Sequence, residues 1–268
     1  MAERTKVPVA LTVAGSDSGG GAGVQADLKT FAALGVHGTS AIACLTAQNP
    51  RRVLAVEACS PGMLRRQLEA VFEELPPAAV KTGMLYSAEN IRVVAKFLSA
   101  QRPAPSAQRL VIDPVMVSTS GAKLLEPAAI KVLREKLLPL AALVTPNLDE
   151  AEILAGGKVS TVEAMREAAR EIRRRFGCAV LVKGGHLRGG RDAVDIFFDG
   201  RTELLLSAPF VKGISTHGTG CTYSAAICAA LARGEKLPRA VGTGKNFISN
   251  AIANSRRAGK HWVLGPAL

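Results

Sequence analysis

Short apolar runs alternate with helical stretches along almost the whole chain, and this alternation constrains the fold more than any other feature. A repeated strand–helix–strand order predicts an α/β fold, in which a mostly parallel central sheet has helices on both faces and forms a three-layer αβα sandwich. The runs LVI, ALV and AVLV are apolar throughout, which is typical of strands buried on both sides. The expected strands span residues 9–14, 39–47, 78–81, 110–112, 141–144 and 179–182.

Residue types that begin helices support this order of elements. Ser60 followed by Pro61 predicts the start of one helix. The spacing from Ser160 to Glu163 predicts a capping box at the start of another. Further helices are expected over residues 22–34, 221–233 and 238–255.

Composition limits the class of protein and its partners. The 268 residues are 48% apolar, so we expect a single domain over residues 1–268. The net charge of +12 favours anionic partners. However, the densest basic run, residues 166–175, contains glutamates and no aromatic residues, which indicates a solvated, ion-paired helix face and no nucleic-acid binding.

Cysteine usage and the lack of long apolar runs point to the cytoplasm. The five cysteines are odd in number and have no C-x-x-C spacing, so neither a disulfide framework nor a zinc site is expected. The first residues contain no apolar signal region, and no apolar run approaches the length of a membrane span. We therefore expect a soluble cytoplasmic protein that does not bind membranes.

Polar or glycine residues follow each of the expected parallel strands. Because the carboxyl ends of parallel strands meet at one edge of a sheet, these residues predict a ligand site there. They are Gly15-Ser16-Asp17, Gln48-Asn49, Lys81-Thr82-Gly83, Asp113, Thr145-Pro146-Asn147 and Lys183-Gly184-Gly185-His186.

The first glycine-rich segment, GSDSGGGAG at 15–23, precedes an expected helix. Its spacing does not match G-x-G-x-x-G, and no lysine followed by serine or threonine ends it, so it is neither a dinucleotide fingerprint nor a P-loop. Two interpretations stay open: a tight strand-to-helix turn, or a loop that approaches a small substrate closely.

The second glycine-rich segment, STHGTGCT at 215–222, also leads into an expected helix. Gly218 and Gly220 allow backbone N–H groups to face inward and form an anion-binding nest. Cys221 would lie at the helix N-terminus, where the pKa of a thiol falls. The alternative is a glycine turn followed by a buried structural cysteine.

Charged residues at the same edge are suited to a phosphate and a cation. Asp113 and Glu150 are carboxylates of the kind that binds magnesium, directly or through water. Lys183 can neutralise phosphate charge, and Asp27 can orient a substrate group. The alternatives are first-turn helix charges for Asp27 and Glu150, and a surface lysine for Lys183.

Taken together, these segments resemble the hydroxymethylpyrimidine/phosphomethylpyrimidine kinase family of the ribokinase-like superfamily. The resemblance covers nearly the whole chain in the family's order, without the second domain of the longer fused forms. The motifs are LTVAGSDSGGGAGVQADLKTFAALGVHGTS at 11–40, LTAQN at 45–49, VKTGML at 80–85, IDPVMVSTSGAKLL at 112–125, VTPNLDEAEIL at 144–154, LVKGGH at 181–186 and THGTGCTYSAA at 216–226.

The resemblance implies two ATP-dependent phosphorylations of an aminopyrimidine alcohol, a magnesium cofactor and a homodimer. It implies that Gln48 hydrogen-bonds the aminopyrimidine and that Gly218, Gly220 and Cys221 form the anion hole. The other implied pocket residues are Gly15, Asp27, Met84 and Val115, and the implied ATP and magnesium residues are Asp113, Asn147, Glu150, Lys183 and Thr219.

The resemblance also raises a mechanistic hypothesis and two alternatives. Many sugar kinases of the superfamily have an aspartate as general base where this chain has Cys221, so we hypothesise that Cys221 is a base or proton relay. A pyridoxal kinase is the nearest alternative, because it shares the scaffold and the GTGC loop. A non-catalytic module that binds a nucleotide or vitamin intermediate is the alternative from another class.

Overall fold

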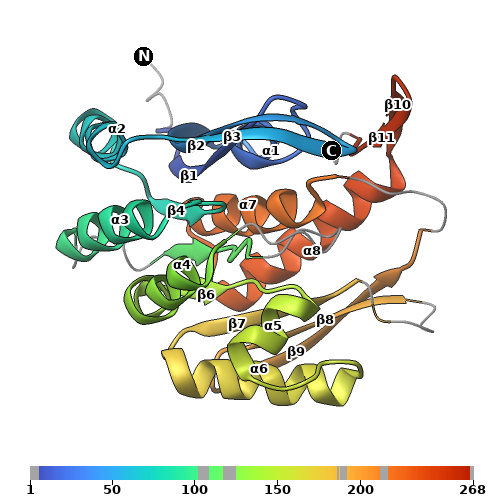
Figure 1. Ribbon diagram of the computed structural model, residues 1–268. Helices are drawn as coiled ribbons and strands as arrows, with labels where there is room; N and C mark the ends of the chain where they lie inside the picture. Colours follow the sequence, from blue (N-terminus) through green and yellow to red (C-terminus); the bar gives the residue numbers. More distant parts are fainter. Residues whose placement is uncertain are drawn as a thin grey trace.

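The computed structural model describes residues 6–101, 109–116, 125–185, 187, 192–211 and 217–265. Within these ranges nine strands form one sheet, in the order β3-β2-β1-β4-β5-β6-β7-β8-β9, and β10 and β11 form a separate hairpin (Figure 1). The strands are β1 (Val9–Asp17), β2 (His37–Asn49), β3 (Arg52–Ala58), β4 (Ala79–Thr82), β5 (Leu110–Ile112), β6 (Leu143–Val144), β7 (Ala179–Gly184), β8 (Asp192–Phe198), β9 (Glu203–Pro209), β10 (Arg256–Ala258) and β11 (His261–Val263).

Six neighbouring strands in the centre of the sheet run parallel to one another: β2, β1, β4, β5, β6 and β7. At one side of the sheet, β3 pairs antiparallel with β2. At the other side, β8 pairs antiparallel with β7, and β9 pairs antiparallel with β8. Parallel neighbours cannot be joined by a tight turn, and helices supply most of the crossover connections between them. The expected mostly parallel sheet is therefore confirmed.

Helices cover both faces of the sheet (Figure 1). One hydrophobic core lies between the sheet and α2 to α6, and a second lies between the sheet and α1, α7 and α8. The expected three-layer arrangement is confirmed. The helical elements are α1 (Gly23–Ala33), α2 (Pro61–Glu74), α3 (Ala88–Ala100), α4 (Pro127–Val132), η2 (Leu133–Leu137), η3 (Leu138–Leu140), α5 (Leu148–Ala155), α6 (Val162–Phe176), α7 (Thr219–Ala232) and α8 (Leu237–Ala253).

Helix caps agree with one prediction and correct another. The hydroxyl of Ser60 accepts a hydrogen bond from the N–H of Met63 at the start of α2, as expected. The predicted capping box at Ser160 is wrong by one residue, because Thr161 caps α6 and accepts from the N–H of Ala164. Both residues are good caps, so composition alone did not determine the position.

The carboxyl ends of β1, β2, β4, β5, β6 and β7 all point to the same edge, because these strands are parallel. The polar segments that follow them are therefore brought together. Among the residues that the structure describes, no helix is both long enough and apolar enough to span a bilayer.

Candidate active site

Lys183 and Asp113 form the centre of the polar edge. Lys183, in β7, donates from Nζ to Oδ1 of Asp113, just after β5, over 2.9 Å. The two side chains are only 13% and 5% exposed. Burial by itself would lower the pKa of Lys183, but the charges of Asp113 and Glu150 outweigh it and raise the pKa. Lys183 is therefore a cation inside the site, which excludes the surface-lysine interpretation.

The start of α7 faces this ion pair. A side-chain carbon placed on Gly220 would lie 3.2 Å from Nζ of Lys183 and 3.7 Å from Oδ2 of Asp113. Gly218 precedes the helix with φ of +86° and no side-chain cap. The first-turn N–H groups of a helix lack intrahelical partners and carry partial positive charge. Together with Lys183 they suit an anion such as a phosphate.

Gly218 also joins the two glycine-rich loops. A side-chain carbon there would lie 1.7 Å from the carbonyl oxygen of Gly21, so only glycine fits. Thr219 is the first residue of α7 and lies beside this junction. Ser215, Thr216 and His186, which belong to the predicted motifs, lie outside the described residues.

Cys221 lies in the first turn of α7, as expected, but its predicted low pKa is wrong. Burial raises the pKa of the thiol, and the carboxylates Asp27 and Asp113 raise it further. The charge of Lys81 and a hydrogen bond from the N–H of Gly23 lower it, without reversing the direction. The helix-end argument therefore fails because desolvation is the larger effect here. Cys221 keeps its proton in this structure.

Glu150 and Asn147 form a capping box at the start of α5. Oε2 of Glu150 accepts from the N–H of Asn147, and Oε1 accepts from the N–H of Met116, each over 2.9 Å. Burial raises the pKa of Glu150 to about 7, assisted by the charge of Asp113 and opposed by that of Lys183. The first-turn interpretation of Glu150 is thus correct, and the carboxylate also holds the loop after β5.

The loop that Glu150 holds contains a strained residue. Val115 has φ of +44°, which is rare for a β-branched side chain. The hydrogen bond from the N–H of Met116 to Glu150 lies next to it and fixes this conformation. Strain of this kind is kept only where neighbouring groups determine the backbone. It supports a functional role for the predicted pocket residue Val115.

The acidic residues fit a water-mediated magnesium site better than a protein cage. Within the described part of the chain, no group of three His, Cys, Asp or Glu side chains is placed to hold a metal ion. The charge of Asp113 raises the pKa of Glu150, so the two carboxylates lie close to each other. Magnesium commonly binds one or two carboxylates and completes its shell with water and phosphate oxygens. The donor set is consistent with that arrangement.

Asp27 does not lie in the wall of the site. Its carboxylate accepts hydrogen bonds from Nζ of Lys81 and from the hydroxyl of Thr12. Asp27 and Lys81 are both 0% exposed, so a substrate cannot reach Asp27 in this conformation, although the resemblance implies a direct contact. A side-chain carbon on Gly83 would lie 3.2 Å from Nζ of Lys81. Asp27 therefore lies beneath the site and supports it through Lys81.

The predicted pocket residues Gly15 and Met84 do lie together. A side-chain carbon on Gly15 would lie 2.7 Å from Sγ of Cys44 and 3.8 Å from the carbonyl oxygen of Met84. Gly15 is thus packed closely against β2 and the segment after β4, with no room for a side chain. This close packing fits a tight strand-to-helix turn, and the small-substrate interpretation of the first glycine-rich loop stays a prediction.

Asp17 and His217 stand in the predicted motifs, but their contact with each other and with Gln48 was not predicted. Nε2 of His217 lies 2.8 Å from Nε2 of Gln48 and 3.1 Å from Oδ2 of Asp17. Asp17 also accepts hydrogen bonds from the N–H groups of Gly19, Gly21 and Ala22. Burial would raise the pKa of Asp17, but the hydrogen bonds from His217 and the backbone outweigh it and lower the pKa. An aspartate that precedes several glycines is typical of a turn in which its side chain accepts backbone hydrogen bonds, and this was the available sequence signal for Asp17.

Comparison with known proteins decides the family. The family model described as phosphomethylpyrimidine kinase matches residues 17–265. The chain belongs to this family. A hydroxymethylpyrimidine/phosphomethylpyrimidine kinase of Rhizobium meliloti is 50% identical over 250 residues, which cover 93% of this chain and 92% of that protein. The crystal structure of an ADP complex of Bacillus subtilis pyridoxal kinase is 36% identical, with a TM-score of 0.88 and 98% of both chains covered.

Some relatives are longer than this kinase. The thiamine biosynthesis bifunctional protein ThiED of Geobacter sulfurreducens is 48% identical over 250 residues, and the chain spans 50% of its length. The resemblance drawn from the motifs is confirmed, and so is the ribokinase-like α/β fold.

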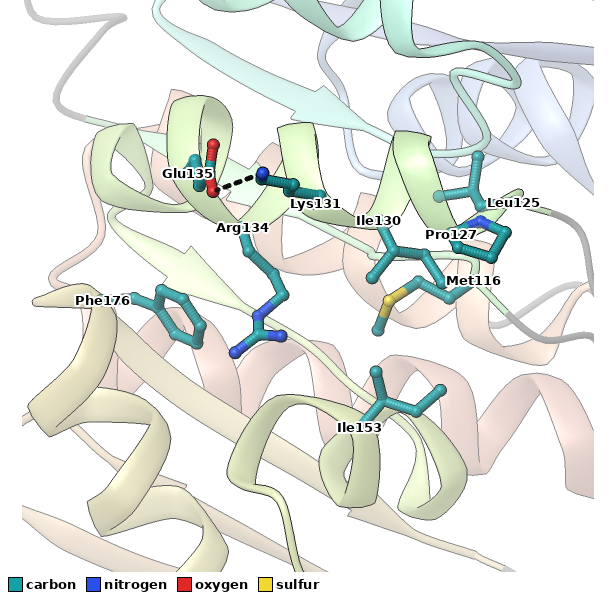
Figure 2. A pocket seen from close by; sticks show the side chains of 9 residues that line it. All are labelled: Met116, Leu125, Pro127, Ile130, Lys131, Arg134, Glu135, Ile153 and Phe176. Atoms are coloured by element: carbon teal, nitrogen blue, oxygen red, sulfur yellow. Dashed lines mark ion pairs between the residues drawn. The ribbon is translucent and has the colours of Figure 1, made fainter.

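A cavity of about 780 Å³ lies between α4, η2 and the helices α5 and α6 (Figure 2). Met116 is in its wall, but none of the predicted site residues lines it. The polar edge, where the predicted site residues gather, is therefore the candidate active site. The lining residues are Met116, Leu125, Pro127, Ile130, Lys131, Arg134, Glu135, Ile153 and Phe176.

Proposed function

We propose that this kinase transfers the γ-phosphoryl group of ATP to the hydroxyl of 4-amino-5-hydroxymethyl-2-methylpyrimidine. A second transfer to the phosphate of the product then gives the diphosphate for thiamine biosynthesis. The observation that carries the proposal is the buried Lys183–Asp113 pair, which faces the uncapped, glycine-flanked start of α7. The relatives named above, which include hydroxymethylpyrimidine/phosphomethylpyrimidine kinases, support it.

The phosphate end of the site stabilises charge. Phosphoryl transfer depends mainly on positioning and on neutralising the transferring oxygens. The N–H groups beside Gly218 and Gly220 would bind those oxygens, and Lys183 would add a full positive charge. Asn147 and Thr219 would bind the nucleotide at the neighbouring loop ends.

Magnesium would lower the negative charge on the ATP phosphates when bound. Asp113 would hold it directly or through water, because within the described part of the chain its Oδ2 accepts one long hydrogen bond, from Ser224 over 3.4 Å. Glu150 would act through water, since both of its oxygens already accept backbone N–H groups.

The substrate end of the site is formed by Gln48, Gly15, Met84 and Val115. The ring would lie among these residues. Gln48 would hydrogen-bond the aminopyrimidine. Asp27 contributes from below by holding Lys81 in place.

Pyridoxal phosphorylation is the second candidate activity. The similarity to a Bacillus subtilis pyridoxal kinase, at a TM-score of 0.88, favours it. Both substrates are small heteroaromatic alcohols, so the phosphate end of the site suits either. The discrimination between them therefore depends on the groups that contact the ring.

We also propose that the kinase is a homodimer. Apolar side chains on the paired strands β2 and β3 are exposed: Leu45 by 53%, Val53 by 44% and Leu54 by 61%. A second copy packed against this surface would bury them. Sedimentation velocity of the wild type and of a Leu54→Glu variant tests this, with dimer and monomer as the expected results. A monomeric wild type would contradict it.

A coupled ADP-release assay with ATP and magnesium tests the proposed activity. It compares the pyrimidine alcohol, its monophosphate, pyridoxal and a sugar panel at equal concentration. Turnover of both pyrimidines is expected. Turnover of pyridoxal alone would overturn the substrate assignment, and ligand binding without any turnover would favour a non-catalytic module.

A further inference from the structure

Among the described residues, the side chain of Gln48 has one hydrogen-bond partner, His217, and the backbone of Gln48 is fixed. Ser18 accepts a hydrogen bond from the N–H of Gln48 and donates its hydroxyl to the carbonyl of Gln48, each over 2.8 Å. Only the side-chain amide of Gln48 can therefore turn. Its Nε2 lies 2.8 Å from Nε2 of His217, a residue 169 positions away in the sequence.

The hydrogen-bonding groups of Gln48, His217 and Asp17 are not complementary in this arrangement, because Nε2 of His217 faces both an NH2 group and a carboxylate. An imidazole nitrogen carries either one hydrogen or one lone pair, and an amide nitrogen only donates. The same Nε2 of His217 lies 3.1 Å from Oδ2 of Asp17, and a carboxylate only accepts. If Nε2 holds a hydrogen, it opposes the amide hydrogens of Gln48. If Nε2 holds a lone pair, it opposes the carboxylate of Asp17.

Asp17 decides between these two states. Its carboxylate accepts hydrogen bonds from three backbone N–H groups of the glycine-rich loop, which stabilise the ionised form and keep the carboxylate from turning. The Nε2 of His217 must then carry the hydrogen. Gln48 relieves the mismatch by turning its amide over, since its oxygen and nitrogen occupy nearly equal volumes. One N–H of His217 is then shared between the oxygens of Asp17 and Gln48.

We propose that His217 determines the ring specificity of this kinase by fixing the orientation of the Gln48 amide. With its oxygen held by His217, Gln48 presents its NH2 group to a ring nitrogen that accepts. The second lone pair of the Gln48 oxygen can accept from an amino group on the adjacent ring carbon. The preferred ring is therefore one with an acceptor nitrogen next to an exocyclic amine. This inference rests on the proposed placement of the substrate ring against Gln48.

Replacing His217 by phenylalanine tests the proposal, because it keeps a ring and removes the donor. For the pyrimidine alcohol we expect KM to rise about tenfold, the effect of one hydrogen bond, with kcat changed less than about threefold. For an analogue in which the amino group is replaced by hydrogen, KM should change less than about threefold. His217→Gln retains a donor and should restore most of the selectivity.

His37→Phe is the matched control, because His37 is an exposed histidine at the far end of the same strand as Gln48. It should leave both KM values unchanged. An equal loss for the amino and des-amino substrates with His217→Phe would assign His217 a purely structural role and overturn the proposal. So would the absence of any loss.

The tautomer of His217 in the wild-type protein without substrate is an independent test. Long-range ¹⁵N–¹H NMR of the histidine rings, assigned by the signal lost in His217→Phe or His217→Gln, should show the hydrogen on Nε2. A hydrogen on Nδ1 with a bare Nε2 would overturn the proposal, even if a variant fails to fold. If the wild type does not phosphorylate the pyrimidine, the proposed function fails by that result alone, and the NMR measurement still decides how His217 and Gln48 are paired.

Discussion

Replacing Lys81 by methionine should destabilise the fold strongly. Nζ of Lys81 lies 2.8 and 2.7 Å from the two oxygens of Asp27, and both side chains are 0% exposed. Methionine keeps most of the apolar length and removes the charge, so among the described residues Asp27 retains one donor, Thr12. Removing one partner of a buried pair typically costs about 3–5 kcal/mol. We expect the free energy of unfolding, measured by urea titration at pH 7, to fall by about that amount.

The loss should also depend on pH, with a defined sign. Burial already raises the pKa of Asp27 above its ordinary value, against the charge of Lys81. Without Lys81 the folded state should keep Asp27 protonated, whereas the unfolded chain ionises it. Stability then falls as pH rises, by at most about 1.4 kcal/mol per pH unit for one proton. The difference in the free energy of unfolding between the variant and the wild type should therefore be smallest near pH 5 and largest near pH 8.

Two companion variants make the test decisive. Adding Asp27→Leu to Lys81→Met should recover most of the loss, because replacing a whole buried pair by apolar groups is often neutral or stabilising. Lys96→Met removes an exposed lysine from α3 and should change stability by less than about 0.5 kcal/mol. A loss below about 1 kcal/mol in Lys81→Met, or a double variant as unstable as the single one, would refute the reasoning.

Three further predictions concern the phosphate end of the site. Gly218→Ala should lower kcat in the ADP-release assay by about a hundredfold or more, because its side-chain carbon would lie 1.7 Å from the oxygen of Gly21 and displace the anion-binding N–H groups; near-normal turnover would contradict this. Cys221→Ala should keep kcat within about tenfold and leave the pH profile unchanged, because the raised pKa keeps the thiol protonated; a loss above about a hundredfold would restore the general-base hypothesis. Glu150→Gln should destabilise by about 1–3 kcal/mol, since an NH2 group would face a backbone N–H. In the wild type, the folded state keeps Glu150 protonated up to about pH 7, whereas the unfolded chain ionises it at the ordinary glutamate pKa, so the free energy of unfolding falls as pH rises between these two values. Glu150→Gln should remove this fall. A pH dependence of urea unfolding identical to that of the wild type would contradict this.

The parallel core and the site edge were predictable because each rests on a local pattern. Apolar runs identify strands buried on both sides, and the polar residue after each run is fixed in place by the strand's end. Strand β3 lacked such a signal. It pairs only with β2, and its apolar residues Val53 and Leu54 are exposed, so its sequence has neither alternation nor a buried run.

Residues whose role depends on a distant partner were not predictable in the same way. Asp27 is defined by Lys81, which lies 54 positions away and was itself expected only as a strand-end residue. The pKa of Cys221 is determined by burial and by carboxylates from other elements, which outweigh the helix terminus that the sequence makes visible. His217 meets Gln48 only because the two glycine-rich loops contact each other at Gly218.

The two lysine–aspartate pairs beneath and within the site have the same chemistry, and their exposure explains why their functions differ. Lys81 and Asp27 are sealed at 0% exposure and satisfy each other, so they hold β4 against α1 and no phosphate can reach them. Lys183 and Asp113 remain partly accessible at the start of α7. A phosphoryl oxygen above Gly220 would offer Lys183 a second anionic partner, and Asp113 would then be released towards a cation. We therefore expect the sealed pair to provide rigidity and the open pair to exchange partners as charge moves during the proposed phosphoryl transfer.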